Sequence, residues 1–310
     1  MEFYNTYIDR NSKKDISIYI TDEVSLDVTV ICGKNEGKTL VLTSAVHGCE
    51  YVGVKTLMDL KKELEPERMS GNVIIIPFVN KEGFLRGEKR IVPYDGKNLN
   101  RVFPANENGT VSEKIAYAIE KYIYPKADFL ADLHSGDINE RLTSFIFFSV
   151  SAEESVSKIG EEGAKSMSFD YRVASTSKNG LYSYAGQKGI PSLLLERGQQ
   201  GLWSDNEVTA YKKNMYELMS HLGIIEEKFE KPEQKRIDIA KYIEAPCDSL
   251  WYPYYNAGDK IKKGDILGEI KDLEDNTIEK YIAEFDGIVL YNTTSLGVKE
   301  KDSLVSYGKL

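Results

Sequence analysis

The chain has 310 residues, of which 41% are hydrophobic and 29% charged, with a formal net charge of −9; it has room for a sizeable core, and its composition is that of an ordinary soluble globular protein. The negative charge argues against a nucleic-acid surface, although a pocket can still hold arginines for an anionic small substrate. We expect a cytoplasmic protein without a membrane partner, because no apolar run reaches the roughly 20 residues of a membrane helix, no secretory signal is visible, and three scattered cysteines do not suggest disulfides.

The first part of the chain alternates expected strands with expected helices. Residues 16–20, 26–33 and 38–46 have the apolar pattern of strands. Residues 50–64 then place apolar side chains at helical spacing, opposite a charged face. Residues 71–80 are a near-continuous apolar run, which predicts a strand buried on both faces of a sheet.

The same alternation continues further along the chain. A helix is expected at residues 112–123, with Ser112 as its N-cap. Two buried strands and a helix ending at a glycine follow, at residues 127–134, 190–196 and 205–223. The alternation predicts an α/β domain over residues 1–225, with a mostly parallel sheet between layers of helices.

The pattern changes after residue 225. Residues 226–236 are dense in charge and contain a proline, which predicts a linker or exposed connection. Short strands and Gly-Asp turns follow, so we expect residues 226–310 to form this linker and a small all-β module. The module is similar to lipoyl or biotinyl carrier domains, but no lysine stands at the expected hairpin tip. We therefore expect it to cover part of a crevice, or to make subunit contacts, rather than carry a prosthetic group.

Four side chains with ligand or acid–base chemistry fall at or just past the ends of expected strands, where ligands bind in open α/β sheets. His47 and Glu50 lie three residues apart at a turn entering a helix. His134 ends another strand, with Asp132 as a candidate partner. Glu196 closes an apolar strand, where a carboxylate is costly to bury unless it is paired or functional. Two histidines and a glutamate are a known ligand set for catalytic zinc, but a chance H-x-x-E pair, a strand-capping histidine and a surface glutamate stay open as alternatives.

The stretch RGEKRIVPYDGKNLNRVFP (residues 86–104) supplies basic and amide side chains. It is rich in turn residues, and long ordered loops over a sheet edge are disproportionately functional. Arg90, Asn100 and Arg101 are the candidates to reach the crevice, because guanidinium groups bind carboxylates and stabilise oxyanions. Simple solvation of these side chains is the alternative.

The motifs HGCE, NLNRVFP, DLH and LLLERG occur in this order and resemble those of zinc carboxypeptidase-like hydrolases. They are more closely similar to the succinylglutamate desuccinylase/aspartoacylase branch, over roughly residues 25–225. The resemblance implies a carboxypeptidase-like, mostly parallel mixed sheet flanked by helices. A small C-terminal all-β domain of lipoyl or barrel-sandwich type is also typical of that branch.

The resemblance also implies a role for most of the candidate residues. The implied ligands of one Zn²⁺ ion are His47, Glu50 and His134. Glu196 matches the general base of the family, and Arg90 matches the arginine that stabilises the oxyanion.

The resemblance also implies that Asn100 and Arg101 bind the substrate carboxylate. The sequence departs from the family pattern at Asn98, where an aspartate usually precedes Leu-Asn-Arg. This removes a negative charge beside the arginine. Cys49 fills a variable position of the family motif, and we expect a buried, inert thiol there.

The implied function is zinc-dependent hydrolysis of the amide bond of an N-acyl amino acid or a similar small amide. This is the reaction of a deacylase, an amidohydrolase acting on carbon–nitrogen bonds other than peptide bonds. A metallocarboxypeptidase acting on short peptides is the alternative, since the same residues serve both reactions, and a non-catalytic binding protein of the same fold is a third. The added β module favours the smaller substrate, and a homo-oligomer is left open.

Overall fold

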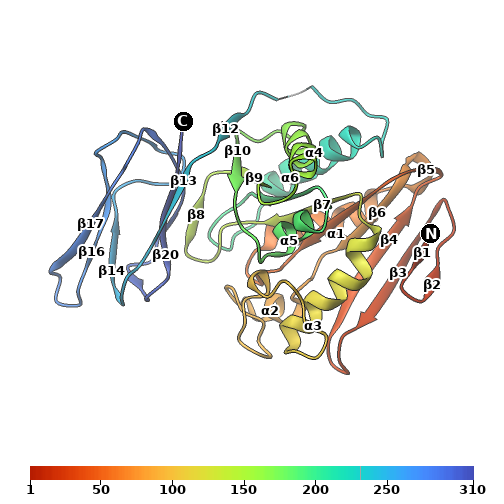
Figure 1. Ribbon diagram of the computed structural model, residues 1–310, viewed down its shortest axis with the longest axis horizontal. Helices are drawn as coiled ribbons and strands as arrows, with labels where there is room; N and C mark the ends of the chain where they lie inside the picture. The colour runs from red at the N-terminus through yellow and green to blue at the C-terminus, as the bar shows by residue number, and fades with distance from the viewer. Residues whose placement is uncertain (231) are drawn as a thin grey trace.

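The computed structural model, which describes residues 1–230 and 232–310, is built around a nine-stranded mixed sheet. Its strands are β3 Ser12–Tyr19, β4 Ser25–Cys32, β5 Asn35–Ser44, β6 Ser70–Ile76, β7 Phe129–His134, β9 Phe145–Ser149, β10 Tyr171–Ser175, β11 Ser192–Glu196 and β12 Lys235–Ile237. They lie in the order β12-β10-β9-β11-β7-β5-β6-β4-β3 (Figure 1). A separate two-stranded ribbon at the N-terminus pairs β1 Glu2–Phe3 with β2 Thr6–Tyr7.

The middle of the large sheet is parallel. Strand β5 pairs in parallel with β6 and β7, and β11 pairs in parallel with β7. Antiparallel pairs occur between β11 and β9, and between β4 and its neighbours β3 and β6. All residues of β7 are buried, as expected for a largely apolar strand in the middle of a sheet; the polar ones are Asp132 and His134. The expected α/β fold with a large mixed sheet is therefore confirmed.

Helices cover both faces of this sheet (Figure 1). They are α1 Tyr51–Glu63, α2 Lys81–Arg86, α3 Val111–Ala118, α4 Glu154–Lys165, α5 Leu181–Gln187 and α6 Asp205–His221. Side chains of α1, α4 and α6 share one core cluster with Leu40 and Leu42 of β5, whereas α3 and α5 share another with Val41. This alternation along β5 is the two-residue period of a strand that contacts a core on each face.

The start of α3 differs from the expectation. Thr110, not Ser112, is the N-cap, and its backbone N–H donates to Glu113 Oε2 at 2.8 Å. This Thr-x-x-Glu arrangement is a capping box, and it begins the helix two residues earlier than a cap at Ser112 would. Ser112 is instead buried, and its hydroxyl donates to Asp95 Oδ1 at 2.7 Å.

The C-terminal part, residues 240–310, contains strands and turns but no helix among its described residues. Its strands are β13 Ala240–Glu244, β14 Ser249–Pro253, β15 Lys260–Ile261, β16 Ile266–Lys271, β17 Thr277–Ile282, β18 Gly287–Thr293, β19 Gly297–Val298 and β20 Ser303–Lys309. They form two sheets, in the orders β13-β20-β18-β15 and β17-β16-β14-β19, around a core that includes the buried Trp251.

Two strands tie the C-terminal part to the α/β part. Strand β8, Glu140–Leu142, leaves the α/β part to pair with β18. Conversely, β12 begins at the end of the charged stretch expected as a connection, residues 226–236, and pairs in parallel with β10. Lys231 of that stretch lies outside the described residues. Among the described residues, no helix has the length and apolarity needed to cross a membrane.

Candidate metal centre

The carboxyl ends of three neighbouring parallel strands bring four predicted side chains together. His47 and Glu50 follow β5, His134 ends β7, and Glu196 ends β11. In the register between β11 and β7, Glu196 stands directly beside His134. The convergence that the sequence left open follows from this parallel arrangement.

His47, Glu50 and His134 form a compact ligand cluster. Glu50 is the N-cap residue of α1, and its Oε1 lies 2.7 Å from His47 Nδ1 while its Oε2 lies 2.8 Å from His134 Nδ1. One ligand atom from each residue can be chosen so that all three atoms lie within 4.8 Å of one another. The two Nδ1 atoms and the carboxylate therefore face a common point, which suits a metal ion.

The charges of this cluster are strongly coupled. Burial opposes ionisation of Glu50, but the two adjacent histidines lower its pKa to about 2. Burial likewise disfavours a charged His134, yet the carboxylates of Glu50 and Asp132 raise its pKa well above the usual value. Without a metal, the carboxylates thus draw a proton onto His134; a bound cation would replace that positive charge.

The outer nitrogens of both histidines contact side-chain oxygens. His134 Nε2 lies 2.9 Å from Asp132 Oδ2, which confirms the predicted partner, and the Thr43 hydroxyl donates to Asp132 Oδ1 at 2.7 Å. His47 Nε2 lies 3.3 Å from Asn98 Oδ1. An acceptor at Nε2 places the ring proton there and leaves the Nδ1 lone pair for a metal. Asn98, where the sequence lacks the aspartate of the family pattern, thus contacts one of the candidate metal ligands.

Glu196 holds a buried carboxylate oxygen without a partner. Its Oε2 has no hydrogen-bond donor among the described residues. Burial raises the pKa of Glu196 well above its usual value; His134 acts against this rise, while Glu50 adds to it. A buried and unpaired oxygen is costly, so its exposure to a bound substrate or water is the arrangement expected of a group that transfers protons.

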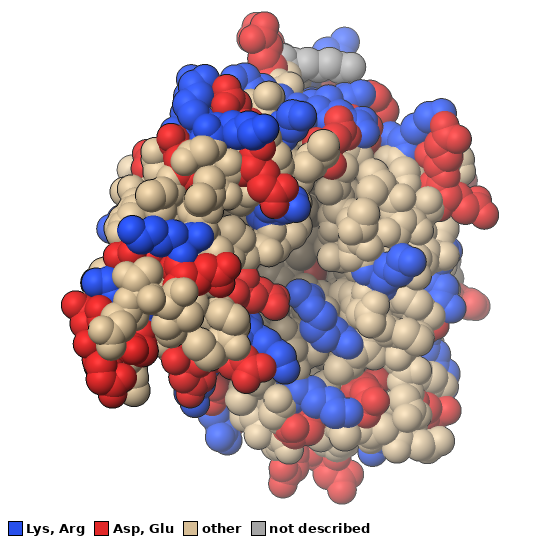
Figure 2. Space-filling view, turned by 60° about the vertical axis from the view of Figure 1, so that its left-hand side comes forward, with Lys and Arg blue, Asp and Glu red and all other residues tan. Residues whose placement is uncertain are grey.

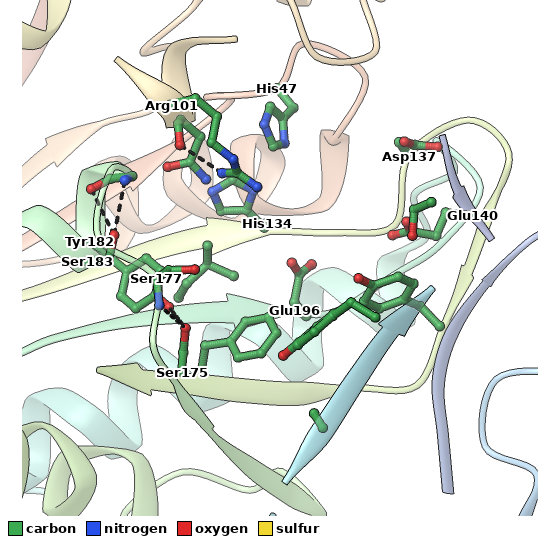
Figure 3. Close-up of a pocket in the computed structure, with 18 of the residues that line it drawn as sticks. His47, Arg101, His134, Asp137, Glu140, Ser175, Ser177, Tyr182, Ser183 and Glu196 are labelled. Atoms are coloured by element: carbon green, nitrogen blue, oxygen red, sulfur yellow. Dashed lines mark hydrogen bonds between the residues drawn. The ribbon is translucent and has the colours of Figure 1, made fainter. Parts of the chain in front are cut away.

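A pocket of about 520 Å³ lies over the ligand cluster, and all seven predicted site residues line it. Figure 3 shows Arg101 beside the two histidines and Glu196 near the centre. The far wall comes from the C-terminal part through Tyr242 and Tyr291, as expected for a module that covers a crevice. On the face shown in Figure 2, acidic and basic side chains are interspersed around a central hollow.

The basic and amide residues of the loop differ in how they are held. Arg90 Nη2 lies 3.4 Å from Asp137 Oδ2. Asn100 is buried, and its Oδ1 accepts the Leu181 N–H at 2.9 Å, so only its NH₂ group remains to contact a ligand. Arg101 Nη1 donates to the Asn100 carbonyl at 2.8 Å.

Several residues that line the pocket were not predicted from the sequence. The wall near Arg101 carries the hydroxyl groups of Ser175, Ser177 and Tyr182, and the Tyr182 hydroxyl donates to Ser175 Oγ at 2.7 Å (Figure 3). The sequence did not choose between Tyr182 and Tyr184, and it is Tyr182 that lines the pocket. Ser175 ends β10, Tyr182 lies on α5 and Ser177 lies between these two elements. The sequence pattern did not predict either element, so it did not point to these residues.

Cys49 lies within the H-x-x-E motif but does not join the cluster. It is fully buried, as expected, and burial raises the pKa of its thiol to about 12. A neutral thiol is a poor metal ligand and a poor nucleophile.

The chain is similar in sequence and fold to known proteins. Residues 36–222 match the family model of the succinylglutamate desuccinylase/aspartoacylase catalytic domain. The N-alpha-acetyl-L-2,4-diaminobutyric acid deacetylase of Halomonas elongata is 28% identical over 91% of this chain and 84% of the relative. The product-bound ectoine utilization protein EutE (DoeB) of Ruegeria pomeroyi has a TM-score of 0.88 at 25% identity, covering 99% of this chain and 98% of that one. A succinylglutamate desuccinylase/aspartoacylase of Rhodobacter sphaeroides has a TM-score of 0.87 at 25% identity, with the same coverage.

Proposed function

Because the chain belongs to the succinylglutamate desuccinylase/aspartoacylase family, we propose that it is a zinc-dependent deacylase that hydrolyses the amide bond of a small N-acyl amino acid. The observation that carries this proposal is the ligand cluster at the base of the pocket, with Glu196 beside His134 in the strand register. The deacetylase and desuccinylase names of its relatives support the same reaction class.

His47, Glu50 and His134 would hold the metal. Two imidazoles and one carboxylate are the donor set of catalytic zinc sites that keep a position open for water or substrate. The oxygens at both Nε2 atoms fit this role, because they orient the rings toward the ion. A bound zinc ion supplies Lewis acidity toward the amide carbonyl and acidifies water.

The other residues act on the substrate. Glu196 is the proposed general base, and its raised pKa suits a group that accepts a proton from water and returns it to the leaving amine. Arg90 is held near the pocket by Asp137 and is the proposed donor to the carbonyl oxygen as negative charge develops. Arg101 and the Asn100 NH₂ group are proposed to bind the substrate carboxylate.

The shape of the pocket favours a small amide over a peptide. Its volume of about 520 Å³ lies within the range of small-molecule sites. Tyr242 and Tyr291 of the C-terminal part line one side of it and leave less room for the rest of a peptide than an uncovered crevice would. We therefore place the deacylase ahead of the metallocarboxypeptidase.

The test is a metal analysis combined with a substrate panel. Zinc-loaded protein is assayed on N-acetyl, N-succinyl and N-formyl amino acids, including Nα-acetyl-2,4-diaminobutyrate, and on short peptides. The Glu196→Gln variant should retain zinc and lose turnover by roughly 10²–10⁴-fold, whereas His134→Ala should lose zinc. Protein that binds no zinc and gains no activity when zinc is added would favour the non-catalytic alternative, and near-normal turnover by Glu196→Gln would remove the role of the base.

A further inference from the structure

A buried tyrosine of helix α6 contacts the backbone at both strand ends that carry the site. Tyr211 is fully buried, and its hydroxyl lies 2.7 Å from the Leu195 carbonyl oxygen of β11 and 3.1 Å from the His134 carbonyl oxygen of β7. A phenol has a single proton to donate. The two carbonyls can therefore share this donor only while the ends of β7 and β11 stay close together.

On the β7 side, the hydroxyl acts on a peptide group that also contacts the ligand cluster. The His134 carbonyl accepts the Arg197 N–H at 3.2 Å as well as the Tyr211 hydroxyl, so both of its lone pairs are used. The N–H of the same peptide group belongs to Ser135 and donates to Glu50 Oε2 at 3.3 Å. Hydrogen bonds in such a chain polarise and orient one another. The hydroxyl is thus linked to two of the three candidate metal ligands.

On the β11 side, helix α6 contacts the chain both before and after the proposed base. The Leu195 carbonyl, which accepts the Tyr211 hydroxyl, belongs to the peptide group that leads into Glu196. Arg197, on the other side, donates through Nε to Asn214 Oδ1 at 3.2 Å. Tyr211 and Asn214 are three residues apart and therefore share one face of α6. Since Glu196 Oε2 has no donor among the described residues, the position of this carboxylate depends on the backbone that carries it.

We propose that Tyr211 is a positioning residue of the site, whose hydroxyl sets the separation between the ligand cluster and the Glu196 carboxylate. It acts through the two strand ends, because it is not among the residues that line the pocket. A misplacement of reacting groups by about 1 Å can cost about 10²-fold in rate, so a small separation of β7 from β11 is enough to matter. The effect on catalysis rests on the proposed deacylase function, whereas the effect on the ligand cluster does not.

The first part of the test is the kinetics of Tyr211→Phe. This change removes the hydroxyl and keeps the ring, which packs edge-to-face against Phe169. For zinc-loaded protein acting on Nα-acetyl-2,4-diaminobutyrate, we expect kcat to fall by about 10–100-fold. KM should stay within about twofold, because Asn100 and Arg101 lie on a different segment.

Tyr124→Phe is the matched control. Tyr124 is also buried, and its hydroxyl also donates to a backbone carbonyl, that of Leu181 in α5, at 2.5 Å. Both variants should therefore lose similar stability in urea unfolding. Only Tyr211→Phe should lose kcat, and the control should keep it within about twofold.

The second part of the test needs no substrate. In Tyr211→Phe, we expect zinc affinity, measured by competition with a chelator, to fall by about tenfold. The visible absorption bands of the cobalt-substituted protein, which report on ligand geometry, should shift relative to those of the wild type and of Tyr124→Phe.

Four results would overturn the positioning role. They are an unchanged kcat and cobalt spectrum in folded Tyr211→Phe, a rise in KM alone, an equal loss of kcat in the control, and a Tyr211→Phe variant that does not fold, since the hydroxyl would then serve the fold and not the site. If wild-type protein hydrolysed none of the substrate panel, the deacylase proposal would fail. Zinc affinity and the cobalt spectrum would still decide the role of Tyr211.

Discussion

The two histidines of the ligand cluster differ in what holds their outer nitrogens, and this difference predicts unequal effects on metal binding. His134 contacts the carboxylate of the fully buried Asp132 at 2.9 Å, whereas His47 contacts the neutral amide of Asn98 at 3.3 Å. Removing the charged partner, Asp132, should weaken zinc binding more than removing Asn98, because the carboxylate orients the imidazole ring and raises its basicity. We expect Asp132→Asn to weaken zinc binding by about 10–100-fold, and Asn98→Ala to weaken it less.

Competition with a chelator of known affinity measures both constants, and circular dichroism checks that each variant is folded. Zinc affinity unchanged in folded Asp132→Asn would contradict a supporting role for this carboxylate. A larger loss in Asn98→Ala than in Asp132→Asn would reverse the ranking of the two histidines.

The protonation of His134 predicts how metal affinity depends on pH. The pKa of His134 is lowered by burial but raised more by Glu50 and Asp132, so the metal-free protein holds a proton there. Glu50, with a pKa of about 2, stays ionised. Zinc must displace the His134 proton. The zinc affinity should therefore rise with pH until the pH passes the pKa of His134 in the metal-free protein, and it should stay constant at higher pH. Calorimetry in two buffers of different ionisation enthalpy counts the released protons; binding without proton release, at constant affinity across pH, would contradict this assignment.

At the level of secondary-structure elements, the sequence predicted those whose apolar side chains follow a clear period. The central strands β5, β6, β7 and β11 were recognised because they are buried on both faces, and α1 and α6 because each has an apolar stripe. Helix α4 was not predicted, because its buried face includes the small residues Gly160, Gly163 and Ala164. A Cβ on Gly163 would lie 2.5 Å from the ring of Phe129, so the contact requires glycine, and glycine carries no hydrophobic signal.

Helix α3 anchors the loop that carries the substrate residues, and this contact can be tested. Asp95, within that loop, accepts the Ser112 N–H and hydroxyl at 2.7 Å each and the Lys97 N–H at 3.0 Å. These bonds are the reason that the pKa of Asp95 is lowered despite partial burial, which acts to raise it. Asp95→Ala should destabilise the protein by about 1–3 kcal/mol and loosen residues 86–104, which raises KM through Asn100 and Arg101.

Urea unfolding gives the stability change, and hydrogen exchange of residues 86–104 reports on the loop. Asp128→Ala is the matched control, because Asp128 Oδ2 also accepts a backbone N–H, that of Thr39, at 2.7 Å, but outside the loop. Both variants should lose stability, and only Asp95→Ala should expose the loop. Unchanged exchange in Asp95→Ala would show that the loop is held by its other contacts.

At the scale of the whole molecule, one part of the site can be predicted from the sequence. The other part depends on how the C-terminal part packs against the α/β part. The ligand cluster and Glu196 follow strands that are parallel neighbours, so their convergence is a consequence of sheet order. The wall containing Glu140, Tyr242 and Tyr291 arises only where β8 joins the sheet of the C-terminal part. No local pattern in the sequence specifies that pairing, because it is a contact between segments about 150 residues apart.

Metal loading should therefore stabilise the protein as a whole, because the ion joins segments that follow different strands. His47 and Glu50 follow β5 and His134 ends β7, and in the metal-free protein these side chains are linked by hydrogen bonds, by charge and by an edge-to-face contact of the two imidazole rings. An ion bound to the folded state alone, at a thousand times its dissociation constant, adds about 4 kcal/mol. This should raise Tm by roughly 5–10 °C, as measured by calorimetry with zinc and after chelation. His134→Ala should abolish the zinc-dependent shift, whereas Glu196→Gln, which removes no ligand, should preserve it. A Tm that is the same with zinc and with chelator would show that the cluster binds no metal under these conditions, and a shift that persisted in His134→Ala would place the stabilising ion elsewhere.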